Sequence, residues 1–170
     1  GIHANGFSLV RKIITDNEVN LEDAAPFNSQ QRLADTLLAP TRIYVNSVLA
    51  TLDEPGHGVK GIAHITGGGF HENLPRILPN GAGAKLNAST WPLPEIFCWL
   101  RELGHIDSAE MTRTFNCGIG MVMVIRPSRL EHIKNVLSAH GETVHHIGEI
   151  VPSDRPKESV IIDNLETAWK

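Results

Sequence analysis

The feature that most constrains the fold is a short apolar run that ends in three consecutive glycines. Residues 61–66, which include His64, predict a strand; Thr66, Gly67, Gly68 and Gly69 predict a tight turn, and residues 70–74 predict a short helix. Consecutive glycines allow backbone N–H groups to converge on an anion such as phosphate. The alternative is a turn that only packs a strand against a helix, and the residues alone favour neither interpretation.

This glycine turn matches neither of two common nucleotide-binding motifs. It is not G-x-x-x-x-G-K-[ST], the P-loop, and it is not G-x-G-x-x-G, the dinucleotide-binding fingerprint. A P-loop site and a Rossmann site are therefore not supported. The phosphate interpretation rests only on the glycines and on the partial positive charge of a helix N-terminus.

Helix and strand signals alternate along the 170 residues without the strict βαβ rhythm of a doubly wound sheet. They predict helices over residues 8–16, 29–39, 41–52, 94–103 and 130–140, a shorter helix capped by Ser108, and strands over residues 119–125, 143–151 and 159–162. An apolar stripe on the helix over residues 41–52 is expected to pack: Val45, Val48, Leu49 and Leu52. We predict one α+β domain over residues 1–170, a mixed β-sheet with helices packed on it.

Composition narrows the classes of function. The chain has 15 Lys and Arg against 19 Asp and Glu, so its net charge of −4 disfavours non-specific binding to nucleic acids or to anionic membranes. No stretch reaches the roughly 18–20 apolar residues of a membrane-spanning helix. Cys98 and Cys117 lie far apart and outside any zinc-binding spacing, so we expect a reducing cytoplasm and no metal site.

The first residues carry a group of polar side chains just before a predicted helix. Hydrogen-bond donors for an oxyanion or a phosphate can cluster there: His3, Asn5, Ser8 and Arg11. The alternative is that Asn5 and Ser8 only cap the helix and that Arg11 is solvated, and for an isolated pattern this alternative is favoured. The residues alone therefore make this group only a weak candidate.

Three further kinds of residue were weighed for chemistry. His64 interrupts an apolar strand, and a buried, hydrogen-bonded histidine is more common than an acid/base group. Cys117 is interpreted as structural because no partner histidine follows from its spacing. The tryptophans are interpreted as packing anchors, since no basic residues are interleaved with them: Trp91, Trp99 and Trp169.

Several strings of residues, in order along the chain, resemble those of the aminoimidazole ribonucleotide synthetases. They are GIHANGFSLVRK at 1–12, LAPTRIYV at 38–45, IAHITGGGF at 62–70 with ENLPR at 72–76, and MTRTFNCGIGM at 111–121, with further matches at 141–142 and 147–148. The resemblance covers Gly1 to about Ile150. It identifies the chain as the C-terminal domain of such an enzyme, without the N-terminal ATP-binding domain.

The resemblance implies an ATP-dependent ring closure in purine synthesis. Formylglycinamidine ribonucleotide and ATP give aminoimidazole ribonucleotide, ADP and phosphate, with Mg²⁺ and ATP bound mainly by the N-terminal domain. It implies a cytoplasmic homodimer at full length, an inactive domain when alone, and His64 and His3 as catalytic candidates. Contacts to substrate or phosphate are implied for Asn5, Ser8, Arg11, Thr66, Gly67, Gly68, Gly69 and, more weakly, Asn116.

Two alternatives remain open. Related ATP-dependent enzymes share the architecture with other substrates, namely the selenophosphate synthetase, thiamine-phosphate kinase, hydrogenase-maturation and formylglycinamidine ribonucleotide synthase types. These relatives lack the string at residues 113–118 as it stands here. A non-catalytic module that binds a phosphorylated metabolite is the alternative from another class.

Overall fold

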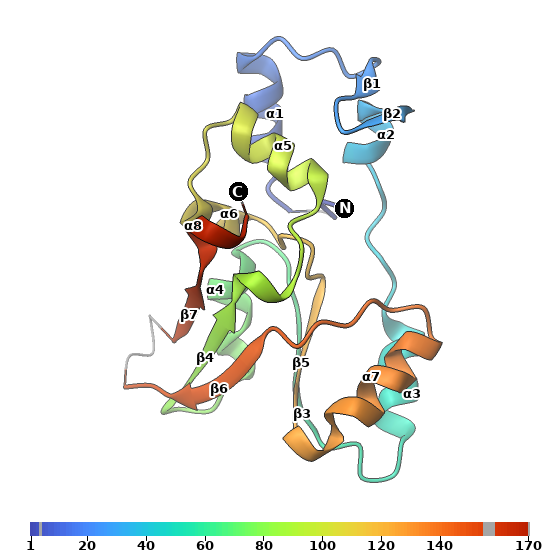
Figure 1. The fold of residues 1–170 in the computed structure, drawn as a ribbon, viewed down its shortest axis with the longest axis vertical. Helices are drawn as coiled ribbons and strands as arrows, with labels where there is room; N and C mark the ends of the chain where they lie inside the picture. Colours follow the sequence, from blue (N-terminus) through green and yellow to red (C-terminus); the bar gives the residue numbers. More distant parts are fainter. Residues whose placement is uncertain (4, 155–158, 170) are drawn as a thin grey trace.

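A computed structural model describes residues 1–3, 5–154 and 159–169 (Figure 1). Its α-helices are α1 (Phe7–Asp16), α2 (Leu33–Leu37), α3 (Val45–Asp53), α4 (Gly69–Asn73), α5 (Glu95–Leu103), α6 (Ser108–Thr114), α7 (Leu130–Ala139) and α8 (Leu165–Ala168). Its strands are β1 (Ala24–Ala25), β2 (Asn28–Arg32), β3 (Val59–His64), β4 (Ala82–Asn87), β5 (Met121–Ile125), β6 (Gly148–Pro152) and β7 (Val160–Asp163). None of the helices in these ranges is long and apolar enough to cross a membrane.

The strands form three small sheets in the described part of the chain. β4 lies between β6, which is antiparallel to it, and β7, which is parallel, so this sheet is mixed. β3 and β5 form an antiparallel pair, with His64 opposite Met121, and β1 and β2 form a short hairpin. The α+β class with a mixed sheet is confirmed, although the strands are divided among separate sheets.

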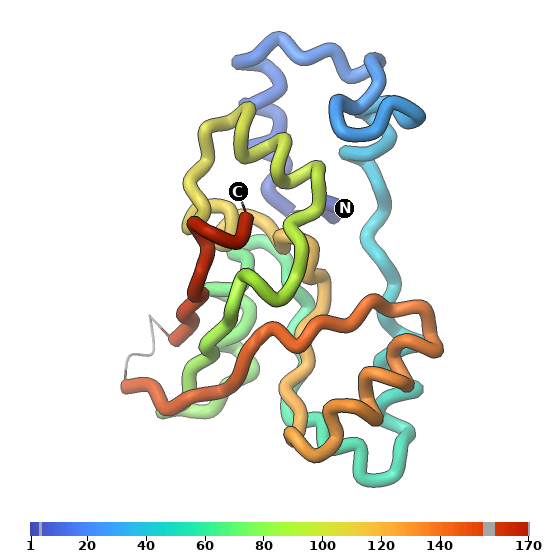
Figure 2. The backbone as a smooth tube through the Cα atoms, in the orientation of Figure 1, coloured from blue at the N-terminus to red at the C-terminus, as the bar shows by residue number. Residues whose placement is uncertain are grey.

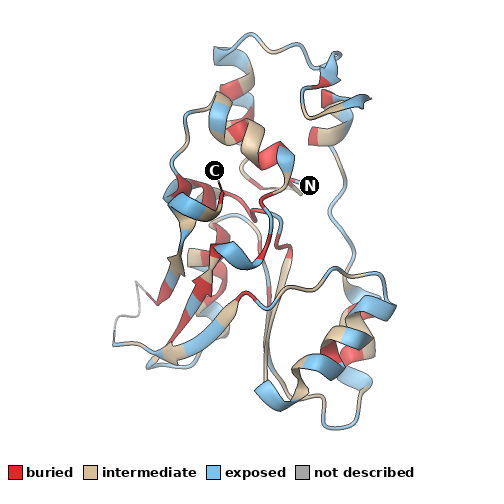
Figure 3. Cartoon of the chain, in the orientation of Figure 1, coloured by how far each residue is buried: buried red, intermediate tan, exposed pale blue. Residues whose placement is uncertain are grey.

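The core lies where α1, α4, α5 and α6 meet the ends of β3 and β5. Phe70, Phe97 and Phe115 are fully buried, and Trp91 packs edge-on against Trp169 with ring centroids 5.4 Å apart. Figure 3 shows that the buried residues gather in this part of the molecule, while α3 and α7 lie apart from it and are more exposed. The interpretation of Trp91 and Trp169 as packing anchors is confirmed.

Some element boundaries differ from the sequence prediction because pairing partners override local preference. Residues 28–32 form strand β2 instead of the start of a helix, since they pair with β1. β4 was not anticipated: it has few strongly β-forming residues but is paired on both sides. Residues 142–147 join α7 to β6 outside regular strand structure, and α6 is capped by the Asp107 carboxylate, not by Ser108.

Helix α3 turns a different face inward from the one predicted. Val45, Leu49 and Leu52 are exposed, whereas Ser47 and Thr51 are buried where α3 packs beside α7. These two hydroxyl groups are satisfied inside the fold, because Thr51 Oγ1 donates to the carbonyl of Ser47 and Ser47 Oγ reaches Glu142. The expectation that the apolar stripe packs is therefore wrong for Val45, Leu49 and Leu52, whereas Val48 is half-buried. Figure 2 shows the extended segment that leads from α2 to this helix pair.

Candidate functional site

Two asparagines hold the first residues of the chain against the end of β3 and the turn before β5. Asn116 Nδ2 donates to the carbonyls of Gly1 (3.2 Å) and Ile2 (3.4 Å), and Asn5 Nδ2 donates to the carbonyl of Ile65 (3.3 Å). Both side chains are buried. The distant strings at the start of the chain, near residue 65 and near residue 116 are therefore brought together.

The two candidate histidines lie at this junction. His3 is half-buried with a φ of 56°, and its Nδ1 is buried with no hydrogen-bond partner among the described residues. Burial is the main cause that lowers the pKa of His3, and the neighbouring His64 lowers it further, so its neutral form is favoured. A buried, unpaired ring nitrogen is one that a bound ligand or water can satisfy.

His64 ends β3 and is exposed, which removes the interpretation of a buried, structural histidine. Its side chain makes no hydrogen bond to any residue that the structure describes, and the edge of the Tyr44 ring system lies beside it, with centroids 5.9 Å apart. The imidazole is therefore available to a ligand. Its catalytic role stays a prediction.

The glycine turn is organised by Asn73 from the last turn of α4. Asn73 Nδ2 donates to the carbonyls of Thr66, Gly67 and Gly69 at 2.8–3.3 Å, and its Oδ1 accepts from Thr66 Oγ1 at 3.2 Å. One buried amide thus fixes three residues of the turn through four hydrogen bonds. The sequence alone did not indicate a role for Asn73, although it lies one helical turn after the last glycine of the turn.

The backbone conformation and the space available for a side chain differ among Gly67, Gly68 and Gly69. Gly69 has a φ of 55°, and a Cβ there would overlap the carbonyl oxygen of Thr112, so α4 can approach α6 closely only at this residue type. Gly68 has a φ of 88°, and a Cβ there would overlap the Glu72 carboxyl group. Gly67 is exposed and has open space around it, so packing does not explain it.

Glu72 bears on the phosphate interpretation of this turn. Its carboxyl group lies against Gly68, and its Oε2 is 3.7 Å from Arg76 Nη2. A carboxylate at the start of a helix occupies the place that an anionic ligand would take. A phosphate group bound at the turn would therefore have to displace Glu72.

Ser8 and Arg11 are exposed on α1. Neither side chain makes a hydrogen bond or an ion pair within the described ranges, and Gly6, not Ser8 or Asn5, is the residue that precedes the helix. The expected capping by Asn5 and Ser8 is therefore wrong, whereas Arg11 is exposed to solvent, as that alternative expected. Their contact with a phosphate group stays a prediction.

Cys117 is a free cysteine in the core. Cys117 is fully buried, and burial raises the pKa of its thiol well above the ordinary range, which agrees with its structural interpretation. Across residues 1–3, 5–154 and 159–169, no three His, Cys, Asp or Glu side chains gather closely enough to hold a metal ion.

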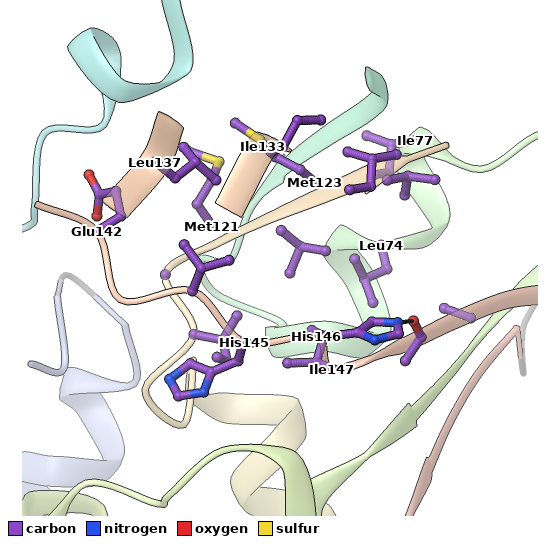
Figure 4. A pocket seen from close by; sticks show the side chains of 18 of the residues that line it. Leu74, Ile77, Met121, Met123, Ile133, Leu137, Glu142, His145, His146 and Ile147 are labelled. Carbon is purple, nitrogen blue, oxygen red and sulfur yellow. Dashed lines mark hydrogen bonds between the residues drawn. The ribbon is translucent and has the colours of Figure 1, made fainter. Parts of the chain in front are cut away.

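A cavity of about 1390 Å³ lies between β5, α7 and residues 142–147 (Figure 4). Its lining is mostly apolar and includes Met121, Met123, Ile133 and Leu137. None of the predicted site residues lines it, but Tyr44 and Gly120, which border the two histidines, do. Figure 4 also shows the rings of His145 and His146 pointing in different directions. The cavity therefore adjoins the histidine junction on the side of Tyr44.

The strings that meet at this junction agree with what comparison with known proteins finds. The family model described as "AIR synthase related protein, C-terminal domain" matches residues 1–161. The chain belongs to this family. A similar curated protein is the phosphoribosylformylglycinamidine cyclo-ligase of Chromobacterium violaceum, 49% identical over 150 residues. The match covers 88% of this chain but 42% of that relative, so the chain spans about two-fifths of the relative's length.

Family membership supports the interpretation of the junction as a candidate functional site, because the strings that meet there are those that carry the resemblance. The resemblance to the aminoimidazole ribonucleotide synthetases and the α+β fold are both confirmed. The sequence reasoning assigned no role to Tyr44, although this residue stands inside one of the four strings. The contact between Tyr44 and His64 could not be predicted from the sequence, because 20 residues separate the two.

Proposed function

We propose that the chain is the C-terminal part of a phosphoribosylformylglycinamidine cyclo-ligase. Such an enzyme closes the imidazole ring of aminoimidazole ribonucleotide from formylglycinamidine ribonucleotide, converting ATP to ADP and phosphate. The observation that carries the proposal is the meeting of the family strings, through the Asn5 and Asn116 hydrogen bonds and the bond from Ile65 N to the Gly120 carbonyl (2.9 Å).

The histidines are the proposed acid/base groups. Ring closure joins an amidine nitrogen to the formyl carbon, removes a proton from that nitrogen, and expels the formyl oxygen, which is activated by phosphorylation. His3 favours its neutral form, which is the form able to accept a proton. The exposed His64 is the group most open to substrate. Holding the two reacting ends together can supply about 7–11 kcal/mol of the barrier.

The glycine turn and α1 are the proposed phosphate contacts. Thr66, Gly67, Gly68 and Gly69 offer a turn fixed by Asn73, and Ser8 and Arg11 offer unpaired donors on an exposed helix. Phosphate binding at the turn requires Glu72 to move. Asn5 and Asn116 act first as anchors of the backbone, since their amide groups are already bonded to carbonyls.

Several features of the whole enzyme belong to the same proposal. ATP and Mg²⁺ are held mainly by an N-terminal part, the full-length enzyme is a cytoplasmic homodimer, and the chain alone does not turn over substrate. The description of the family supports a shared architecture but leaves substrates open. A non-catalytic module that binds phosphorylated metabolites is the alternative, and it predicts ligand binding without turnover in any context.

The test is steady-state turnover of formylglycinamidine ribonucleotide with ATP and Mg²⁺. The full-length enzyme that carries this chain is compared with its His64→Ala variant, with a matched His140→Ala variant, and with the chain alone. His140 is exposed at the end of α7 and bonds the carbonyl of Val136. We expect a fall of about 10²-fold or more in kcat for His64→Ala and none for His140→Ala.

Each outcome decides a separate part of the proposal. Absence of turnover in the wild-type enzyme contradicts the proposed activity and favours the binding module. Full turnover in His64→Ala removes His64 from the acid/base role. Turnover by the chain alone contradicts the two-part arrangement.

A further inference from the structure

Tyr44 lies at the histidine junction, although it comes from the segment that leads into α3. Its ring meets the His64 ring at 68° with centroids 5.9 Å apart. Its hydroxyl oxygen occupies the place where a Cβ on Gly120 would project, and His3 Cε1 lies 3.0 Å from the same place. One side chain therefore touches His64 and borders His3.

The backbone on both sides of Tyr44 is anchored to the end of α7. Arg42 Nε donates to Glu142 Oε2 (2.7 Å) and Arg42 Nη2 donates to the Gly141 carbonyl (2.9 Å). Ser47 Oγ lies 2.9 Å from Glu142 Oε1 and 3.0 Å from the Tyr44 carbonyl, so its one proton is shared between them. Two attachments, one before and one after Tyr44, therefore fix this part of the chain.

The Arg42–Glu142 pair is better placed than a typical surface ion pair. The Glu142 side chain is only 14% exposed, and it accepts hydrogen bonds at both of its oxygens. Partial burial with satisfied oxygens gives such a pair a defined geometry. Because Tyr44 lies between the two anchored residues, its ring has little freedom to move away from His64.

Gly120 completes the arrangement from the other side. Any side chain at this position would overlap the Tyr44 hydroxyl and crowd His3. The carbonyl of Gly120 also accepts from Ile65 N, one residue after His64. The glycine thus lets Tyr44 approach the point where the N-terminal segment and β3 are joined.

We propose that Tyr44 is a positioning residue that holds the His64 imidazole in its working orientation, with Arg42, Ser47 and Glu142 as its support. The inference rests on the proposed function, because it gives Tyr44 a role in the reaction through His64. Reacting groups must be held within about 0.5 Å of their productive positions, and an exposed histidine without hydrogen bonds does not achieve this alone. The tyrosine ring supplies the missing constraint.

The first experiment uses NMR on this chain and does not depend on any reaction. The His64 ring C–H resonances are assigned in the wild type and in Tyr44→Leu, which keeps apolar volume but removes the ring. They are also assigned in Tyr44→Phe, which keeps the ring, and in Ile43→Ala, whose side chain is 82% exposed in the wild type. Loss of the Tyr44 ring current shifts the resonances in Tyr44→Leu whatever the role of Tyr44, so the decisive readout is line width: we expect broadening in Tyr44→Leu and wild-type line widths in the other two.

The second experiment measures turnover in the full-length enzyme for the same variants. We expect Tyr44→Leu to lower kcat about 10-fold or more with little change in KM for ATP, and Tyr44→Phe to restore most of kcat. Unbroadened His64 resonances, or a wild-type kcat in Tyr44→Leu, would overturn the inference. Broadened resonances in an enzyme whose wild type shows no cyclo-ligase turnover would support the positioning of His64 and contradict the proposed function.

Discussion

Replacing Asn73 by alanine should destabilise the chain by about 3 kcal/mol, because hydrogen bonds to a buried side chain are worth about 0.5–1.5 kcal/mol each and leave unpaired groups when removed. Asn73 is 4% exposed and bonds three carbonyls through Nδ2, while Oδ1 accepts from Thr66 Oγ1 and from Arg76 Nη1. Asn73→Asp keeps the accepting oxygens but directs a carboxylate at three carbonyl oxygens. It should therefore lose at least as much stability as Asn73→Ala.

The assay is urea-induced unfolding, followed by circular dichroism, with Asn80→Ala as the matched control. Asn80 is exposed, and its side chain makes no hydrogen bond within the described part of the chain. We expect an unchanged slope against urea and, by the usual scaling for chains of this length, a fall in Tm of about 6–12 °C for Asn73→Ala. A loss below about 1 kcal/mol, or a stable Asn73→Asp variant, would refute the reasoning that Asn73 organises the glycine turn.

Two further predictions concern stability. Gly69→Ala should lower the free energy of unfolding by more than the roughly 1–2 kcal/mol cost of a left-handed residue, because its Cβ meets the Thr112 carbonyl. Gly67→Ala should be neutral or slightly stabilising, because there is open space around Gly67. Urea unfolding of the two variants checks this prediction, and equal losses of stability would contradict it. Burial lowers the pKa of His3 and of His71, so the unfolded chain binds more protons than the folded one as the pH falls below about 6.5. The free energy of unfolding should therefore decrease as the pH falls from neutral to the lowered pKa values. Unfolding measured at several pH values checks this prediction, and a profile that does not change with pH would contradict it. His71→Gln should weaken the pH dependence.

The sequence predicted most of the fold because several elements carry strong local signals. Pro94 and Gly104 bound α5, and the apolar run over residues 119–125 that contains β5 had no competing interpretation. β4 and β2 were missed because their stability comes from neighbouring strands, which a local reading does not contain. The inward face of α3 was mispredicted because an apolar stripe is normally expected to face the core. Here the hydroxyl groups of Ser47 and Thr51 are buried instead, since each has a hydrogen-bond partner inside the fold.

The candidate site was only partly visible in the sequence for a similar reason. Its strings could be recognised one by one, but which of their residues are structural depends on contacts across the chain. Asn116 reaches residues 114 and 115 positions away, and Glu142 reaches Arg42 across 100 positions. Tyr44 and Asn73 gain their importance from such contacts alone, so spacing could not single them out.

The contacts at the junction divide its polar residues into two groups. The asparagines at positions 5, 73 and 116 are buried, and their amide groups are bonded to backbone carbonyls, so their first effect is to hold loops in place. The histidines are different: His3 has a buried nitrogen without a partner, and His64 is exposed without a hydrogen bond to any described residue. A folded chain gains nothing in stability from groups left in this state. A ligand that bonds His3 Nδ1 would satisfy this buried nitrogen, and the proposal that the imidazoles carry the reaction rests on that possibility.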